Sequence, residues 1–158
     1  MCNKISFVII VEGALEVKCA DLEHHDGTIE AFNLKPNSFR EVEWTKNDNG
    51  ESIDVRVNPD ESENKRDMYK RWILERWPNR RKFVDYLLIT WTKGNIDLRD
   101  IEIDKLPDGM PEITGSLDLR GTAITSLPDG LQVGGYLDLE GTAITSLPDG
   151  LQVGGSLD

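Results

Sequence analysis

The pattern of apolar and polar positions predicts strands in the first third of the chain. Residues 41–44 (EVEW) and 53–57 (IDVRV) alternate with a period of two, which is typical of strands that present one face to a core. Val42 and Trp44 would share that face with apolar residues of 53–57. An Asn49-Gly50 pair lies between the two segments and predicts a β-hairpin with a type I′ turn. We therefore expect residues 1–60 to form a β-rich N-terminal domain.

Helical periodicity follows in residues 61–93. A first helix is expected from about Asn64 to Trp77, where Pro78 ends it. Asn79 is a plausible N-cap for a second helix that runs to about Trp91. The residues expected to line the apolar stripes of the two helices are Met68, Trp72, Ile73 and Trp77 in the first, and Phe83, Tyr86 and Leu87 with Thr90 or Trp91 in the second. The sequence thus predicts a helical hairpin.

Residues 94–158 are built from a repeat. Residues 117–136 (LDLRGTAITSLPDGLQVGGY) return almost unchanged as 137–156, and a further copy begins at Leu157. Residues 96–116 form a degenerate earlier copy with one extra residue near Pro111-Glu112. A fixed period of this length is typical of a solenoid, in which each copy buries its apolar edge on the next. We expect such a solenoid, with its last copy left uncapped.

The two close copies differ at two positions, Arg120/Glu140 and Tyr136/Ser156. In a strand of alternating leucines both positions point away from the core. Two hypotheses remain open: the face binds a partner, or exposed positions drift freely. On the first hypothesis, the residues expected to bind the partner are Asp97, Arg99, Ser116, Asp118, Arg120, Tyr136, Asp138 and Glu140.

The repeat unit resembles a leucine-rich repeat. Its positions Leu137, Leu139, Ile144 and Leu147 carry the resemblance, and Thr142 stands where the family has asparagine. The short unit with Leu-Pro is similar to the bacterial and bacteriophage versions of that family. The resemblance covers residues 96–158 only. It implies that the repeats bind proteins through a concave strand face and that the preceding helices act as a cap.

Charge is distributed unevenly along the chain, whose net charge is −11. Residues 61–93 are basic, whereas residues 94–158 are strongly acidic. An acidic repeat region repels phosphate backbones, so we expect it not to bind nucleic acid directly. Asp97, Asp118 and Asp138 recur at one strand position, where adjacent carboxylates repel unless solvent or a basic partner compensates.

Candidate chemistry elsewhere is sparse. Residues 21–26 (DLEHHD) could bind metal, but adjacent histidines on a strand point apart, and a solvated turn is the preferred interpretation. The basic residues of 61–93 could grip nucleic acid, although a solvated or self-paired surface is preferred. Cys2 and Cys19 are expected to be reduced. We expect no cofactor, no catalytic residue, no membrane span, and a cytoplasmic protein.

The expected fold is therefore α+β in three parts. A β-rich N-terminal domain (1–60) precedes a basic helical hairpin acting as a cap (61–93) and a short leucine-rich-repeat-like β-solenoid of 20-residue units (94–158). The expected function is non-enzymatic protein binding through the acidic concave face of the repeats, with possible self-association at the uncapped end. The alternative is an acidic phage-encoded inhibitor, acting in the host cytoplasm, that blocks the nucleic-acid groove of a host defence enzyme.

Overall fold

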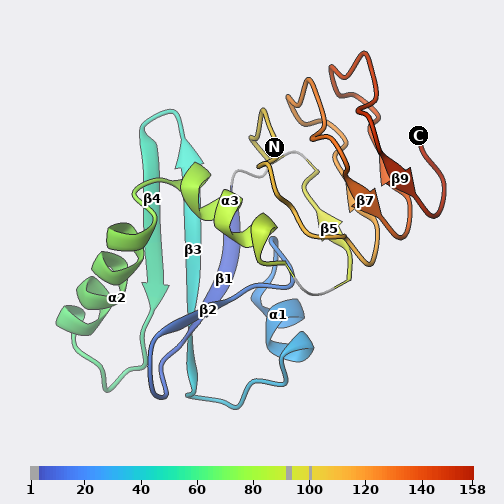
Figure 1. Ribbon diagram of the computed structural model, residues 1–158. Coiled ribbons are helices and arrows are strands. Elements are labelled where there is room, and N and C mark those ends of the chain that lie inside the picture. The colour runs from blue at the N-terminus through green and yellow to red at the C-terminus, as the bar shows by residue number, and fades with distance from the viewer. Residues whose placement is uncertain (1–3, 92–93, 100) are drawn as a thin grey trace. The chain divides into compact units, whose positions relative to one another are not determined.

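The structure is a computed structural model that describes residues 4–91, 94–99 and 101–158. The described residues form a small α+β protein with three helices and several short sheets (Figure 1). The chain separates into two compact units, Lys4–Phe83 and Val84–Asp158, each with its own buried apolar residues.

A four-stranded antiparallel sheet forms the centre of the first unit. The strand order is β2-β1-β3-β4, so β1 and β3 lie side by side in the middle. The strands are β1 (Lys4–Ile10), β2 (Glu16–Lys18), β3 (Phe39–Asn47) and β4 (Gly50–Arg56). On one face of this sheet Phe7 lies opposite Val42 and Ile5 lies opposite Trp44, and all four side chains are buried.

The predicted hairpin is present, with a different turn. Val42 pairs with Val55 and Trp44 with Ile53, as the alternation predicts. The final pair joins Asn47 to Gly50, so Asp48 and Asn49 make the loop. Of the loop residues and Gly50, only Gly50 has a positive φ, at 113°. A type I′ turn needs a positive φ at both central residues, so the predicted turn type is wrong.

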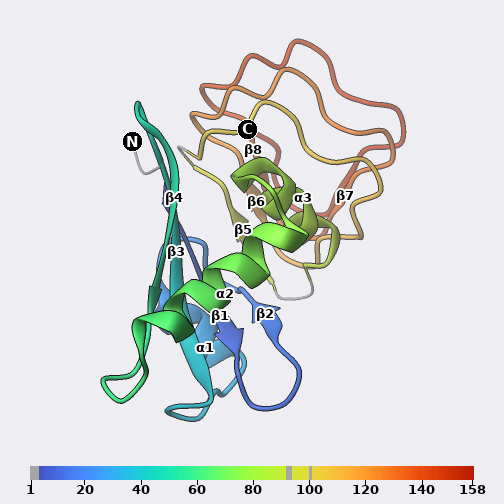
Figure 2. The ribbon, with the colours of Figure 1, turned by 90° about the vertical axis from the view of Figure 1, so that its left-hand side faces the viewer.

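Helices cover both faces of this sheet. Helix α1 (His25–Ala31), which the sequence did not predict, packs against β1, and α2 (Glu63–Arg76) packs against β4 (Figure 2). Helix α3 (Arg80–Ile89) begins where predicted, because the Asn79 Oδ1 accepts the Lys82 backbone N–H at 2.9 Å. The centroid of the Phe83 ring lies 4.3 Å from that of the Phe7 ring, so α3 packs on the core of the first unit through Phe83.

The buried stripes of the two helices differ from the predicted ones. Tyr69 and Ile73 are the buried residues of α2, whereas Met68 is 38% exposed. In α3, Phe83 and Leu87 are buried as predicted, but Tyr86 is exposed. The α2 stripe is therefore rotated by one position from the predicted one, and on its buried side the Tyr69 hydroxyl lies 3.3 Å from the Glu61 carboxylate.

A buried ion pair fixes the segment before α2 to the sheet. Arg40 on β3 donates two hydrogen bonds to the Glu61 carboxylate, at 2.7 and 2.8 Å. Glu61 also accepts the Asn58 backbone N–H. These hydrogen bonds, chiefly those from Arg40, lower the pKa of Glu61 to about 2. A bidentate pair of this kind links two segments far apart in the sequence.

Short parallel strands connect the copies in the second unit. A three-stranded sheet contains β5 (Ile96–Asp97), β6 (Leu117–Asp118) and β8 (Leu137–Asp138), and a two-stranded sheet contains β7 (Gln132–Val133) and β9 (Gln152–Val153). Ile96 pairs with Leu117, twenty-one positions on, whereas Ile113 pairs with Val133, twenty positions on. This change in spacing confirms the extra residue predicted before Ile113.

The fold class expected from the sequence is wrong. In the described residues, the repeat strands are two residues long and lie in two separate short sheets, which pair copy to copy without forming the extended sheet expected of a solenoid. The expected capping hairpin is also not a unit, because α2 packs on β4 and α3 crosses the boundary between the two compact units. Trp77 and Phe83, from the two predicted helices, contact each other within the first unit.

Successive copies lie close together, as the side-by-side loops of Figure 2 show. Leu117, Leu119 and Ile124 are fully buried between neighbouring copies. A side chain at Gly134 would bring its Cβ within 2.6 Å of the Thr114 carbonyl oxygen of the preceding copy, which is too close for any carbon atom. The glycine is therefore required by the approach of two backbones.

Candidate interaction face

The outward strand face of the repeats carries three columns of side chains. Because residues two apart on a strand share a face, each copy contributes its residues before, within and after the two-residue strand. The first column is Asn95, Ser116, Tyr136 and Ser156; the second is Asp97, Asp118, Asp138 and Asp158; the third is Arg99, Arg120 and Glu140. All eight residues predicted to bind a partner lie in these columns.

The aspartates and arginines alternate in a ladder of ion pairs. Arg99 lies 2.7 Å from Asp97 in its own copy and 3.4 Å from Asp118 in the next. Arg120 repeats this arrangement, at 2.6 Å from Asp118 and 3.2 Å from Asp138. Each arginine thus bridges two consecutive copies, and the guanidinium groups offset the repulsion expected between neighbouring aspartates.

The ladder changes the protonation equilibria of its members. Partial burial alone would raise the pKa of Asp97, but the hydrogen bonds from Arg99 outweigh it, and the pKa lies below its usual value. The hydrogen bond to Asp118 raises the pKa of the Arg120 guanidinium further above its usual value, and Asp97 does the same for Arg99. Asp97, Arg99 and Arg120 are therefore charged at neutral pH.

A second, weaker series of links runs along the first column. The Asn95 Oδ1 accepts the Ser116 backbone N–H at 2.8 Å, and the Ser116 Oγ accepts the Tyr136 backbone N–H at 3.0 Å. Both side chains are short enough to reach the neighbouring backbone. The tyrosine side chain has no acceptor atom close to its own backbone, so Tyr136 does not accept the corresponding backbone N–H of the next copy.

The two differences between the close copies fall where the ion-pair ladder and the hydrogen bonds of the first column end. Where Arg99 and Arg120 bridge aspartates, the next copy has Glu140, whose carboxylate has no ion-pair partner within the described ranges. Where Asn95 and Ser116 accept a backbone hydrogen bond, it has Tyr136, which is 42% exposed. The side chains of Tyr136 and Glu140 therefore do not continue the links seen in the preceding copies.

The predicted binding residues consequently differ in accessibility. Ser116 and Asp118 are buried, because Arg99, Arg120 and the neighbouring copies cover them. Arg99, Arg120, Tyr136 and Glu140 are accessible to solvent. The arginine bridges could have been inferred from the sequence, because Arg99 and Arg120 each follow an aspartate by two residues and recur with the repeat spacing.

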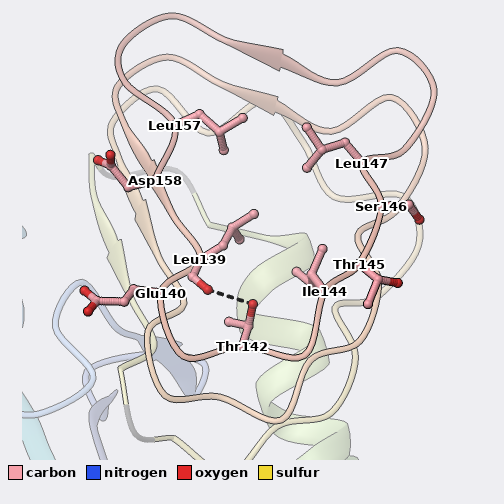
Figure 3. A pocket seen from close by; sticks show the side chains of 9 residues that line it. All are labelled: Leu139, Glu140, Thr142, Ile144, Thr145, Ser146, Leu147, Leu157 and Asp158. Atoms are coloured by element: carbon pink, nitrogen blue, oxygen red, sulfur yellow. Dashed lines mark hydrogen bonds between the residues drawn. The ribbon is translucent and has the colours of Figure 1, made fainter.

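A cavity of about 360 Å³ opens on the last copies (Figure 3). Leu139, Ile144, Leu147 and Leu157 point into it, while Glu140 and Asp158 stand on its outer edge. Thr142 donates a hydrogen bond to the Leu139 carbonyl oxygen at 2.7 Å, within its own copy. The threonine therefore satisfies a local carbonyl group and does not link neighbouring copies.

The cluster at residues 21–26 serves the structure of the first unit. The Asp21 Oδ1 accepts the backbone N–H groups of Glu23 and His24, and α1 begins at His25. The His25 Nε2 lies 3.0 Å from the Val42 carbonyl oxygen. Among the residues that the structure describes, no group of three or more His, Cys, Asp or Glu side chains is placed to hold a metal ion.

Cys19 is free, and burial raises the pKa of its thiol to about 12, so it is not poised to react as a thiolate. Its predicted companion Cys2 lies outside the described residues.

The basic residues of 61–93 that the structure describes lie on α2 and α3, and Lys93 is outside the described ranges. Arg76 stacks over the Trp72 ring at 4.2 Å from the guanidinium carbon to the ring centroid. Arg66 lies 3.6 Å from Glu63 on the same helix. Arg80 is 3% exposed. Several of these cations are thus engaged within the first unit, and nucleic-acid binding by this segment stays a prediction.

Comparison with known proteins identified no relative. No family model, no curated protein and no solved structure matches the chain. The resemblance to leucine-rich repeats therefore stays a prediction from the sequence. No helix within the described residues combines the length and the apolar character needed to cross a bilayer.

Proposed function

We propose that this chain is a non-enzymatic interaction module that binds a partner protein through the outward strand face of its repeats. The observation that carries the proposal is the location of the two differences between otherwise identical copies. Thr125, Asp129 and Gln132 are exposed, yet their counterparts in the next copy are the same residues. The changes fall instead at Tyr136 and Glu140, on the strand face. Free drift would alter other exposed positions as readily.

The composition of the face also suits protein recognition. Tyrosine and arginine are the side chains that most often dominate binding energy at protein interfaces, since they combine apolar area with polar groups. Tyr136 and Arg120 are both about two-fifths exposed, at 42% for the residue and 40% for the side chain. The arginines are held by their aspartates, so they lose little conformational freedom on binding.

The inhibitor hypothesis requires a different distribution of charge on the same face. An acidic protein that fills a nucleic-acid groove must present unpaired negative charge, whereas Arg99 and Arg120 already pair with the aspartates. The acidic excess of the face lies at Glu140 and Asp158. An inhibitor would compete with DNA or RNA for its target and would lose affinity steeply as salt is added.

A photo-crosslinking experiment tests the proposal. A benzoyl-phenylalanine would replace Tyr136 in one protein and Thr125, exposed in the preceding copy but off the strand face, in a matched control. We expect crosslinks to a defined bacterial protein only from position 136. Equal crosslinking from both positions, or crosslinking from Thr125 alone, would contradict the proposal. A captured nucleic-acid enzyme whose binding DNA displaces would favour the inhibitor.

A further inference from the structure

The third column of the face changes sign at one copy. Arg99 and Arg120 each place a guanidinium group between an aspartate of their own copy and the aspartate of the next. At the equivalent position Glu140 has a carboxylate, flanked by Asp138 within its copy and by Asp158 across the strand pair. Glu140 and Asp158 project on the same outer side of the last copies (Figure 3).

We propose, building on the function proposed above, that this patch of Tyr136, Asp138, Glu140 and Asp158 binds an arginine side chain of the partner protein. The incoming guanidinium group would take the place in the ladder that Arg99 and Arg120 hold in the preceding copies. The specificity of the patch follows from the match between a planar guanidinium group and paired carboxylates.

The ladder itself shows which ligand the aspartates of this face accept. In two successive copies the same aspartate column holds a guanidinium group at ion-pair distances of 2.6 to 3.4 Å. The backbone around the third copy is the same, since β8 pairs with β6 in register. An arginine from another protein therefore meets an arrangement of carboxylates that already binds arginine twice in this molecule.

Tyr136 supplies a second contact on the same strand face. Because residues 136, 138 and 140 alternate with the buried leucines, the exposed phenol ring flanks the carboxylates. An aromatic ring beside a cation-binding site favours arginine over lysine, because the flat guanidinium group stacks on the ring. Ser156, the counterpart of Tyr136 in the next copy, cannot stack in this way.

Two other occupants fit less well. A second copy of the chain would present the same face, where Arg99 and Arg120 are already paired and the remaining groups are acidic. A metal ion requires several convergent oxygen ligands. The described residues contain no group of three or more acidic, His or Cys side chains placed for one. A guanidinium group needs only the paired carboxylates that the face provides.

The natural repeat supplies the test variants. Glu140→Arg gives position 140 the residue found at 120, and Tyr136→Ser gives position 136 the residue found at 116 and 156, so both should fold. In Glu140→Arg, the new side chain should bridge Asp138 and Asp158 as Arg120 bridges Asp118 and Asp138. Thr125→Arg introduces the same cationic side chain at an exposed position off the face and serves as the control.

The measurement is binding of a synthetic peptide to the full chain, followed by amide chemical shifts in a two-dimensional NMR titration. The probe is an acetylated, amidated Gly-Arg-Gly-Arg-Gly peptide, compared with versions that carry lysine or uncharged citrulline. We expect shifts around Tyr136 and Glu140, at least tenfold weaker binding by Glu140→Arg, and unchanged binding by Thr125→Arg. Tyr136→Ser should weaken binding roughly two- to fivefold, the size of an exposed cation–π contact.

Binding of the citrulline peptide with equal affinity, shifts elsewhere on the chain, or undiminished binding by Glu140→Arg would overturn the inference. The proposed protein-binding function and the proposed arginine site can be refuted separately. Crosslinking of a partner from position 136, with no response to the arginine peptide, would leave the proposed function standing and refute the arginine site.

Discussion

The two compact units bury their apolar residues in different ways. In the first unit, each core position is filled by a different residue and closed by a segment distant in sequence, as when Phe83 packs on Phe7 and Trp44. In the second unit, the same residue recurs, and its burial depends on which copy holds it. Leu127 is 7% exposed, whereas Leu147, in an identical local sequence, is 51% exposed.

The burial of a side chain therefore has a different cause in each unit. The first unit resembles an ordinary globular core, where the identity of a residue and its distant partners set its environment. In the second unit, the environment of a residue is set by whether another copy lies over it.

The largest effect is expected from Phe7→Ala in the first unit. The ring is fully buried between β3 and Phe83, so its loss leaves a cavity that a tight aromatic cluster fills poorly. The free energy of unfolding of the first unit should fall by about 3–5 kcal/mol. Urea unfolding followed by tryptophan fluorescence measures it, because Trp44 lies in the same core. A loss no larger than that of Phe39→Ala, at a half-buried ring, would contradict the packing described.

The second prediction compares two leucines with the same neighbours in sequence. Leu127→Ala should destabilise the second unit by about 2–3 kcal/mol, whereas Leu147→Ala should cost less than about 1 kcal/mol, because the exposed side chain leaves little cavity. Thermal unfolding of the two variants checks the difference. Equal losses would show that burial in the repeats does not depend on the neighbouring copy.

The third prediction concerns acid and the first unit. The pKa of Glu61 falls from 4.5 to about 2 on folding, so its stabilising effect is complete above pH 4.5 and disappears as the pH falls towards 2. With allowance for solvent screening, this loss is on the order of 1–2 kcal/mol. In urea melts at pH 7 and pH 2.5, the gap in stability between the wild type and Glu61→Gln should narrow at the lower pH. A constant gap would refute this account.

The smallest effect is expected from Arg99→Gln in the ladder. Its guanidinium group is exposed, so solvent screens its ion pairs with Asp97 and Asp118. The melting temperature of the second unit should fall only slightly, and the difference should shrink in high salt. Arg40→Gln in the first unit is the contrasting case, because that arginine is buried against Glu61. A larger effect from Arg99→Gln than from Arg40→Gln would reverse the comparison.

Local signals in the sequence predicted local structure well. The alternation around Trp44 predicted the hairpin, Asn79 predicted the start of α3, and the repeat spacing predicted the pairs between copies. Signals that depend on tertiary contacts failed. Periodicity alone places the stripe at Met68, whereas in the structure Tyr69 is buried and contacts Glu61, which lies outside the helix.

The fold class failed for a related reason. The repeat period indicated how copies pair but not how far their strands extend, and the strands prove to be two residues long. The assignment of the helices as a cap used only their position before the repeats, whereas the partners of α2 lie on β4, in the first unit. For the candidate face, the sequence placed all eight residues in one set of columns, but it did not predict that the arginines would bury Asp118.

The in-register pairing has a consequence for how the gene could change length. Leu117 pairs with Leu137, and Leu137 with Leu157, each twenty positions on, and Val133 pairs with Val153 at the same spacing. Insertion or deletion of one whole copy would therefore leave every remaining pair aligned, whereas a shorter change is tolerated only between strands, where the first copy already holds one extra residue. Large changes in the length of this protein should therefore come in steps of twenty residues.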